Sequence, residues 1–207
     1  MAWLLWWEQL TGATCPGCGQ PLNQPVLCAD CRALLVPRHL PRFVYLGDYR
    51  RFGRLARAVK YQGQRALAEL LGQRIALGVE QAGWRLEGVT AVPTLLHRKV
   101  QRGYNQAELL AKSAARELHL PYQSVLERTL WDISQTKKTL QKRLELAEAT
   151  FRPNRRVQGV WLLVDDVLTT GTTFIRARKA LLEAGAAGVY GAAIAVKSPH
   201  ELSQQAL

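Results

Sequence analysis

The stretch Val160–Ala184, VWLLVDDVLTTGTTFIRARKALLEA, decides how the rest of the sequence is interpreted. Its apolar run Val160–Val164 predicts a strand buried on both faces, which is typical of a parallel sheet. Two adjacent carboxylates, Asp165 and Asp166, come next, and a loop of threonines with one glycine then leads into a helical pattern. Because a helix N-terminus favours anions, this loop predicts a phosphate site beside two carboxylates. A sugar phosphate, which carries both hydroxyls and phosphate, suits that combination.

The composition is that of a globular protein with a strong basic excess. The 207 residues include 28 Lys and Arg against 16 Asp and Glu, a net charge of +12. This excess favours polyanions, whether nucleic acid, anionic lipid or phosphorylated small molecules, without choosing among them. No apolar run reaches the roughly 18 residues of a transmembrane helix. The N-terminus lacks the basic region and cleavage site of a secretory signal. We therefore expect a cytoplasmic protein.

The N-terminal segment MAWLLWWEQL places Trp3, Trp6, Trp7 and Leu10 on one side at helical spacing. This pattern predicts an amphipathic helix. Its apolar side packs on the body of the protein or contacts a membrane or partner, so peripheral membrane association stays open.

Four cysteines form two CxxC pairs, Cys15/Cys18 and Cys28/Cys31, separated by nine residues. Two such knuckles can direct four sulfurs at one tetrahedral zinc ion. Two disulfides or a thioredoxin-like redox pair are the alternatives, but a reducing compartment disfavours disulfides and a redox motif needs only one CxxC. We predict a structural zinc module over residues 1–42 and a larger domain over residues 43–207.

Apolar periodicity predicts the remaining elements. They are a strand or hairpin arm over 43–49, a short basic helix over 52–61, a helix over 64–82, a strand over 89–93, a helix over 105–118, a weaker strand over 123–130, a short helix over 144–149 and a strand over 189–196. Between them we expect a linker at 37–41, an exposed mobile loop over 132–142, a basic connector over 151–157 and a frayed tail after 199. This alternation predicts an α/β fold, a mostly parallel sheet with helices on both faces.

A second polar segment follows the strand that ends near Pro93. Arg98, Lys99 and Arg102 lie in the loop after it. Ligands of open α/β sheets bind at the carboxyl ends of strands, so these cations are candidates for a second anionic group, although a solvated charge run is also compatible. The Asp165–Asp166 pair has a plainer explanation too, because Asp is common in helix caps and turns.

The segment LLVDDVLTTGTT closely resembles the phosphoribosyl-diphosphate-binding motif of type I phosphoribosyltransferases. A P-loop is excluded because no Gly-Lys-Ser/Thr follows a Gly-rich loop, and no G-x-G-x-x-G opens a helix. The four-cysteine module, Lys60-Tyr61-x-Gly63, Arg102-Gly103-Tyr104-Asn105-Gln106 and VDDVLTTGTT occur in the order typical of the ComF (ComFC) competence-protein family. The chain is identified as resembling that family, with a type I phosphoribosyltransferase-like fold.

The resemblance implies roles for individual residues. Asp165 and Asp166 would bind the ribose hydroxyls, directly or through Mg²⁺, and are the catalytic candidates. Phosphoribosyl diphosphate would also contact Val167, Leu168, Thr169, Thr170, Gly171, Thr172 and Thr173, with Pro93, Arg98, Lys99 and Arg102 on the pyrophosphate side. If the site is catalytic, a nucleophile displaces pyrophosphate from the anomeric carbon. Purine enzymes with a similar loop carry Asp where this chain has Thr169, which argues against purine salvage.

Two functions therefore compete. One is a phosphoribosyltransferase with an unidentified acceptor. The other, which the family's role in natural transformation favours, is a competence factor that binds single-stranded DNA and acts with the DNA-uptake machinery at the inner face of the membrane. Cationic grooves with aromatic platforms bind single strands. The nucleic-acid candidates are Tyr61, Tyr104, Trp131, Lys137 and Lys138. Aromatic residues are more often core, and Tyr104 and Asn105 are equally compatible with packing and helix capping.

Overall fold

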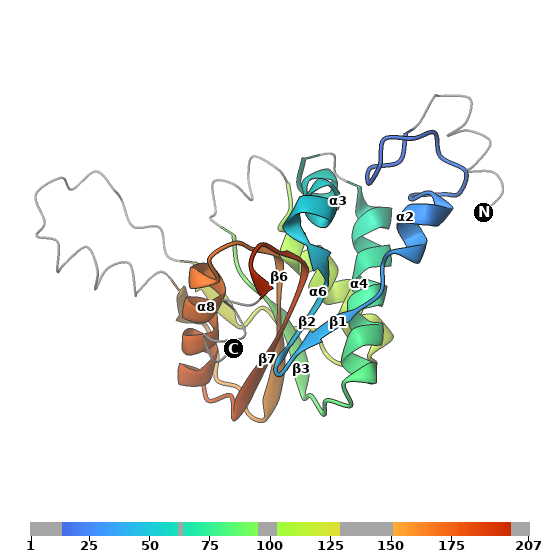
Figure 1. Cartoon of the computed structure of the whole chain (residues 1–207). Coiled ribbons are helices and arrows are strands. Elements are labelled where there is room, and N and C mark those ends of the chain that lie inside the picture. The colour runs from blue at the N-terminus through green and yellow to red at the C-terminus, as the bar shows by residue number, and fades with distance from the viewer. Residues whose placement is uncertain (1–13, 62–63, 95–102, 129–150, 200–207) are drawn as a thin grey trace, which may run out of the picture.

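A five-stranded sheet organises the computed structural model, which describes residues 14–61, 64–94, 103–128 and 151–199 (Figure 1). In spatial order its strands are β1 (Arg38–Leu40), β2 (Phe43–Asp48), β7 (Gly188–Val196), β6 (Val160–Leu168) and β3 (Gly88–Ala91). All neighbours pair in parallel except β1, which lies antiparallel to β2 at the edge. The predicted, mostly parallel sheet is confirmed.

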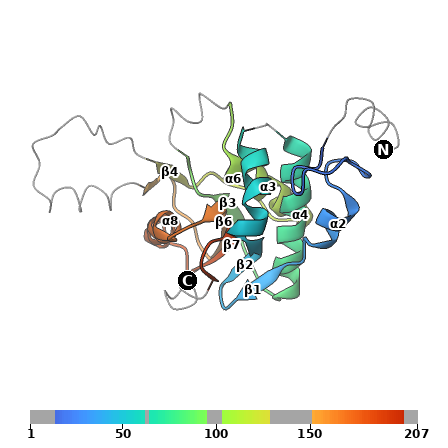
Figure 2. The same ribbon diagram turned by 45° about the horizontal axis from the view of Figure 1, so that its top comes forward.

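Helices cover both faces of this sheet (Figures 1 and 2). One face carries α3 (Tyr49–Tyr61), α4 (Arg65–Gln81) and α6 (Gln106–Glu117). The opposite face carries α8 (Thr172–Glu183) with a small antiparallel sheet of β4 (Leu126–Arg128) and β5 (Phe151–Pro153). A short helix, α2 (Ala29–Ala33), belongs to the cysteine region. The predicted α/β architecture with helices on both faces is therefore confirmed.

The central strands contribute alternate side chains to two separate hydrophobic cores. Leu162 and Val164 of β6 face the core beneath α4 and α6, whereas Trp161 and Leu163 face the core beneath α8. Successive side chains of a strand point to opposite faces, so a strand covered on both faces must be apolar throughout. This explains the continuous apolar run that the sequence shows.

Strand β6 continues beyond the apolar run, through Asp165 and Asp166 to Leu168. The expectation that the strand ends at Val164 is wrong. The register pairs Asp165 with Ala193 and Leu168 with Val196. Because β7 extends this far, its pairing keeps the acidic part of β6 within the sheet. Pairing with a neighbouring strand thus overrides the low strand preference of aspartate.

Three other expectations differ from the structure. The linker at 37–41 contains β1, because its backbone pairs with β2. The connector over 151–157 begins with β5, because Phe151–Pro153 pairs with β4. Helix α3 begins at Tyr49 rather than Phe52. The N-terminal helix with Trp3, Trp6, Trp7 and Leu10, the loop over 132–142, the helix over 144–149 and the tail from residue 200 lie outside the described residues.

The cysteine region packs on the main body of the protein. Leu27 and Leu35 are buried in the same core as the α4 residues Leu71 and Ile75. The His39 ring lies 2.9 Å from the Gly78 carbonyl oxygen and connects β1 to α4. The division of the chain at residue 42 stays a prediction. None of the helices in the described ranges has the length and apolar character that a membrane span requires.

Candidate functional site

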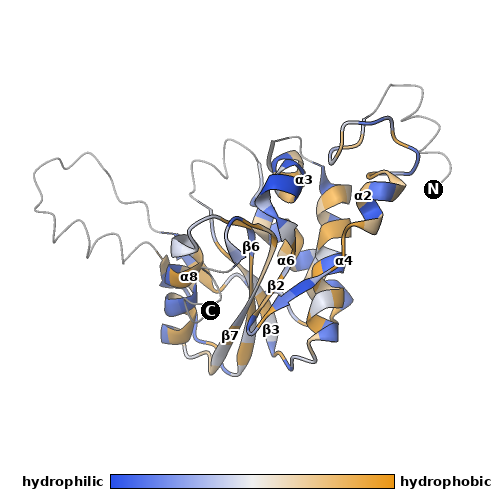
Figure 3. Ribbon diagram, viewed as in Figure 1, coloured by the Kyte–Doolittle hydropathy of each residue, from blue (hydrophilic) through white to orange (hydrophobic). Residues whose placement is uncertain are grey.

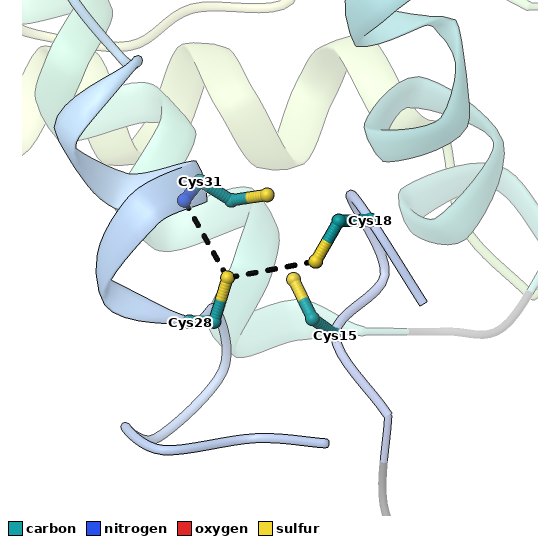
Figure 4. A group of neighbouring side chains, drawn as sticks. All are labelled: Cys15, Cys18, Cys28 and Cys31. Carbon is teal, nitrogen blue, oxygen red and sulfur yellow. Dashed lines mark hydrogen bonds between the residues drawn. The ribbon is translucent and has the colours of Figure 1, made fainter. Parts of the chain in front are cut away.

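The four cysteines converge on one point near the N-terminus (Figure 4). Their Sγ atoms all lie within 4.8 Å of one another, and those of Cys18 and Cys28 are 3.7 Å apart. All four are free thiols. The cluster can therefore hold a metal ion such as zinc, as the CxxC spacing predicts.

Short backbone turns hold the thiols in place. The Cys15 N–H donates to the Gln20 carbonyl at 2.7 Å, and the Cys31 N–H donates to Cys28 Sγ at 3.5 Å. Gly17 leaves the space that the sulfurs need, because a Cβ there would lie 2.9 Å from Cys31 Sγ. The cluster is thus built from within residues 15–31, with a gap that only glycine preserves.

The electrostatics of the cluster favour a cation. Burial opposes ionisation of Cys15, yet hydrogen bonds from neighbouring backbone N–H groups lower its pKa to about 7. Burial, and then the adjacent thiols, raise the pKa of Cys31. Four thiolates therefore cannot coexist here unless positive charge offsets their repulsion, and a bound divalent metal supplies it.

A cleft of about 140 Å³ lies at the carboxyl ends of β3 and β6. Its walls come from the segment after β3, the start of α6, the end of β4, the acidic part of β6 and the first turn of α8: Val92, Pro93, Thr94, Asn105, Gln106, Ala107, Arg128, Asp165, Asp166, Val167 and Thr173. The two segments that the sequence singles out, the Asp pair and the loop after Pro93, therefore meet at one cleft.

The two carboxylates lie where β6 loses one neighbour. The β3 pairing ends at Ala91 opposite Val164, while β7 continues alongside the acids. Each carboxylate accepts the next backbone N–H at 2.8 Å, Asp165 from Asp166 and Asp166 from Val167. Burial, and then the charge of Asp166, raise the pKa of Asp165 well above its usual value. The pair is a concentrated negative charge that suits a cation or hydroxyl donors.

The threonine loop enters α8 through Gly171, which is in the left-handed conformation. Gly171 has φ 73°, which glycine adopts without steric cost, and it forms no side-chain cap. The first N–H groups of α8 therefore lack a side-chain partner. Thr169, Thr170, Thr172 and Thr173 are exposed, the Oγ1 atoms of Thr170 and Thr172 lie 3.1 Å apart, and Thr173 reaches the cleft.

The remaining predicted residues fall into three groups. Val167 and Pro93 line the cleft, whereas the Leu168 side chain is buried in the core beneath α8. Tyr104 donates its hydroxyl to the Val59 carbonyl at 2.7 Å, and Tyr61 is the last residue of α3. Arg98, Lys99, Arg102, Trp131, Lys137 and Lys138 lie outside the described residues.

Several cleft residues are missing from the sequence-based site, among them Gln106, Arg128 and Asn105. Gln106 is 3% exposed, and its Nε2 has no hydrogen-bond partner in the described part of the chain. Arg128 ends β4 and brings positive charge toward Asp165. Asn105 is at the N-cap position but does not cap α6, because its amide donates to the Val92 carbonyl at 3.1 Å. Asn105 and Gln106 belong to the R-G-Y-N-Q segment, which is the part of the sequence that could have indicated this wall of the cleft.

A larger hollow of about 360 Å³ adjoins the cleft. The two share Pro93, Thr94, Asn105 and Arg128. The further lining includes the polar side chains Glu108, Tyr122, Ser124, Glu127 and Asn154. The two hollows therefore adjoin, and the smaller one lies beside the acids.

Comparison with known proteins identifies the family. No family model matches the chain. The DNA utilization protein YhgH of Salmonella typhimurium is 32% identical over 184 residues, 84% of this chain and 80% of the relative. Competence protein ComFC of Bacillus subtilis is 31% identical over 191 residues, covering 87% and 76%.

Among solved structures, glutamine phosphoribosylpyrophosphate amidotransferase from B. subtilis matches with a TM-score of 0.48 and 22% identity over 62% of this chain. The match spans only 26% of that enzyme. The sequence relationships, which extend over most of both chains, show that this chain belongs to the ComF family.

Proposed function

We propose that this protein binds phosphoribosyl diphosphate with Mg²⁺ in the cleft and acts in DNA uptake, in which it binds single-stranded DNA. The observation that carries the ligand part is the meeting of two carboxylates, a helix N-terminus and a buried unpartnered amide in one cleft. The carboxylates suit ribose hydroxyls or a metal ion, and the helix N-terminus and the amide both suit phosphate oxygens. Phosphoribosyl diphosphate carries hydroxyls and phosphates.

The carboxylates suit the ribose and the metal. Carboxylate oxygens accept hydrogen bonds from vicinal hydroxyls, and they are the ligands that Mg²⁺ prefers. Burial, and then the charge of Asp166, raise the pKa of Asp165, so a bound cation would stabilise the ionised pair. Mg²⁺ bound here would neutralise that charge and orient the diphosphate.

The start of α8 suits the 5′-phosphate. Its N–H groups and the exposed threonine hydroxyls are donors, and Gly171 permits close approach of the backbone. The buried Gln106 Nε2 is a further donor on the opposite wall. An unpaired buried amide costs free energy unless a ligand acceptor satisfies it. Arg98, Lys99 and Arg102 remain the predicted cations for the pyrophosphate.

Zinc is the proposed metal of the cysteine cluster. Four thiols within 4.8 Å match the donor set of a closed structural site. Zinc would hold the two knuckles and α2 together there and would leave no position open for a substrate.

The DNA part of the proposal rests on the relatives. One is named for DNA utilization and another for competence, and the present chain covers most of each. The net charge of +12 is compatible with a polyanionic partner.

A transferase is the second candidate function, and the hollow beside the cleft favours it. Its volume of about 360 Å³ and its polar lining offer room for an acceptor next to the proposed ribose position. Release of pyrophosphate in the presence of a panel of nucleobases tests the transferase hypothesis. If no nucleobase causes release of pyrophosphate while phosphoribosyl diphosphate still binds, the binding role is favoured.

The decisive experiment for the ligand is isothermal calorimetry with phosphoribosyl diphosphate and Mg²⁺. The double variant Asp165→Asn/Asp166→Asn should lose affinity by about 100-fold or more, since each hydrogen bond to a charged group contributes about 1.5–3 kcal/mol. The charge-matched control Glu80→Gln/Glu183→Gln replaces exposed acids outside the cleft and should bind like the wild type. Equal affinity of the two double variants would refute the site.

A further inference from the structure

Over residues 49–59 of helix α3, whose side chains the structure describes, the exposed face consists of arginine. Between Tyr49 and Val59 the exposed residues are Arg50, Arg51, Arg54 and Arg57, which we call the arginine face. The opposite side of the helix, with Phe52, Leu55, Ala56 and Val59, is buried in the core above the sheet. Figure 3 shows that α3 contains both strongly hydrophilic and hydrophobic residues.

The arginine face is not balanced by local acids. The segment Tyr49–Tyr61 contains no Asp or Glu, and none of the four arginines forms an ion pair with a described residue. Arginines in the first turn also oppose the helix dipole, and like charges at i,i+4 repel. The sequence of α3 therefore accepts unfavourable electrostatics that an ordinary solvated face avoids.

Helix α6 provides the contrast within the same layer. Lys112 pairs with Glu108 at 2.7 Å in an i,i+4 arrangement. Arg116 pairs with Glu69 of α4 at 2.6 Å. Cations on α6 are thus matched by acids, whereas those on α3 stay available for an external anion.

The spacing suits a linear polyanion. At 100° and 1.5 Å per residue, Arg50, Arg54 and Arg57 lie within an arc of roughly 60° and along about 10 Å of the helix. Guanidinium groups bind phosphate through paired N–H donors. A row of this kind can follow consecutive phosphates of one strand.

We propose that the arginine face binds the phosphodiester backbone of single-stranded DNA. The proposal rests on the DNA part of the proposed function and is independent of the cleft. A membrane surface fits less well, because an interfacial helix needs its apolar side in the lipid and the apolar side of α3 is buried in the protein. Helix α3 begins at the carboxyl end of β2, and the cleft lies at the carboxyl ends of the parallel strands β3 and β6, so the bound strand would pass the same end of the sheet.

The test measures the salt dependence of binding to a labelled oligothymidylate by fluorescence anisotropy. The full-length quadruple variant Arg50→Gln/Arg51→Gln/Arg54→Gln/Arg57→Gln should bind more weakly. The slope of log K against log salt should fall in magnitude by about 2–3, because each lost phosphate contact removes about 0.7. Phosphoribosyl diphosphate affinity, measured by calorimetry on the same sample, should not change.

Two further variants make the result specific. The control Arg85→Gln/Arg155→Gln/Arg156→Gln/Lys179→Gln removes the same charge from exposed sites away from α3 and should leave most of the slope intact. The variant with lysine at all four α3 positions keeps the charge and should retain the slope. Equal losses in the α3 variant and the control would overturn the proposal.

Two other outcomes would also overturn it. One is a loss confined to binding of anionic phosphatidylserine vesicles, with DNA binding intact. The other is a wild-type protein that does not bind DNA at all, which would refute the DNA part of the proposed function as well. DNA binding that survives in the Asp165→Asn/Asp166→Asn variant would support two separate sites.

Discussion

The cysteine cluster draws all its sulfur atoms from residues 15–31, whereas the cleft is assembled from segments between Val92 and Thr173. Both gather acidic side chains, and in both burial, and then the neighbouring acidic groups, raise a pKa, that of Cys31 in one and Asp165 in the other. The thiols face each other around one point. The carboxylates instead share a cleft with donors on the opposite wall. A closed group of donors suits a structural ion, and an open one suits a ligand that comes and goes.

The largest effect on stability should come from removing one thiol of the cysteine cluster. Cys28→Ser removes a buried sulfur that accepts the Cys31 N–H, and we expect the bound zinc to be lost. Loss of a metal site costs about 4 kcal/mol or more, which lowers the melting temperature by about 10 °C. Elemental analysis and calorimetry measure both quantities. Equimolar zinc in the variant, or a folded metal-free wild type with the same melting temperature, would contradict the closed site.

A smaller effect should follow from filling the gap in the cluster. In Gly17→Ala the new Cβ would lie 2.9 Å from Cys31 Sγ, so the knuckles must separate. Overpacking of this kind costs about 1–3 kcal/mol, to be measured by chemical denaturation with zinc present. Gly188→Ala is the matched control, because its Cβ would meet Val160 at an ordinary 3.5 Å. Similar losses in both variants would show that the gap has no special role.

The cleft should respond in the opposite direction from the cysteine cluster, because removing the Asp165 carboxylate should stabilise the ligand-free protein. The folded protein raises the pKa of Asp165, so it binds a proton more readily than the unfolded chain does. Stability of the ligand-free protein should therefore fall as pH rises from the usual aspartate value of 3.8 toward the raised folded-state pKa. Asp165→Asn should remove this dependence and stabilise the protein at neutral pH, by on the order of 1 kcal/mol.

Denaturation curves across pH, with Glu183→Gln as the charge control, measure this difference. A destabilised Asp165→Asn protein would mean that the carboxylate serves the fold and not a ligand. The same pH series with Mg²⁺ should show tighter binding at higher pH, because metal and proton compete for the carboxylate.

The smallest effect should come from the unpartnered amide. Gln106→Leu removes a buried donor that has no partner in the described residues, so the ligand-free protein should be as stable as the wild type or more stable. Affinity for phosphoribosyl diphosphate should fall about fivefold, the loss of one ordinary hydrogen bond. Gln81→Leu, at the exposed end of α4, is the control for calorimetry. Unchanged affinity in Gln106→Leu would exclude a contact between this amide and the ligand.

Periodicity predicted the long helices well. Helix α4 was expected over 64–82 and spans Arg65–Gln81, with Gln64 and Ala82 at the flanking cap positions. Helix α6 was expected over 105–118 and is flanked by Asn105 and Leu118. Apolar residues at helical spacing bury one continuous face, and such a face is visible in the sequence.

Features that depend on distant partners were not predicted. Strand β5 exists because it pairs with β4 across more than 20 residues of chain, and β6 is long because β7 is long. Gln106 became a site residue only when α6 placed its first turn against the end of β6. The sequence motif predicted the acids and the threonines of the site. The wall opposite them, with Gln106, depends on how α6 packs in the fold.

We expect the cysteine cluster to affect the solubility of the protein through strand β1. It follows the cluster directly in the chain and pairs with β2, whose residues Phe43–Leu46 are all buried. An uncovered edge strand of this kind is a template for pairing with another chain. We therefore expect metal loss to free β1, uncover β2 and cause aggregation. The cysteine module with its proposed zinc ion would then keep β2 covered, and the solubility of the protein would depend on the supply of that metal.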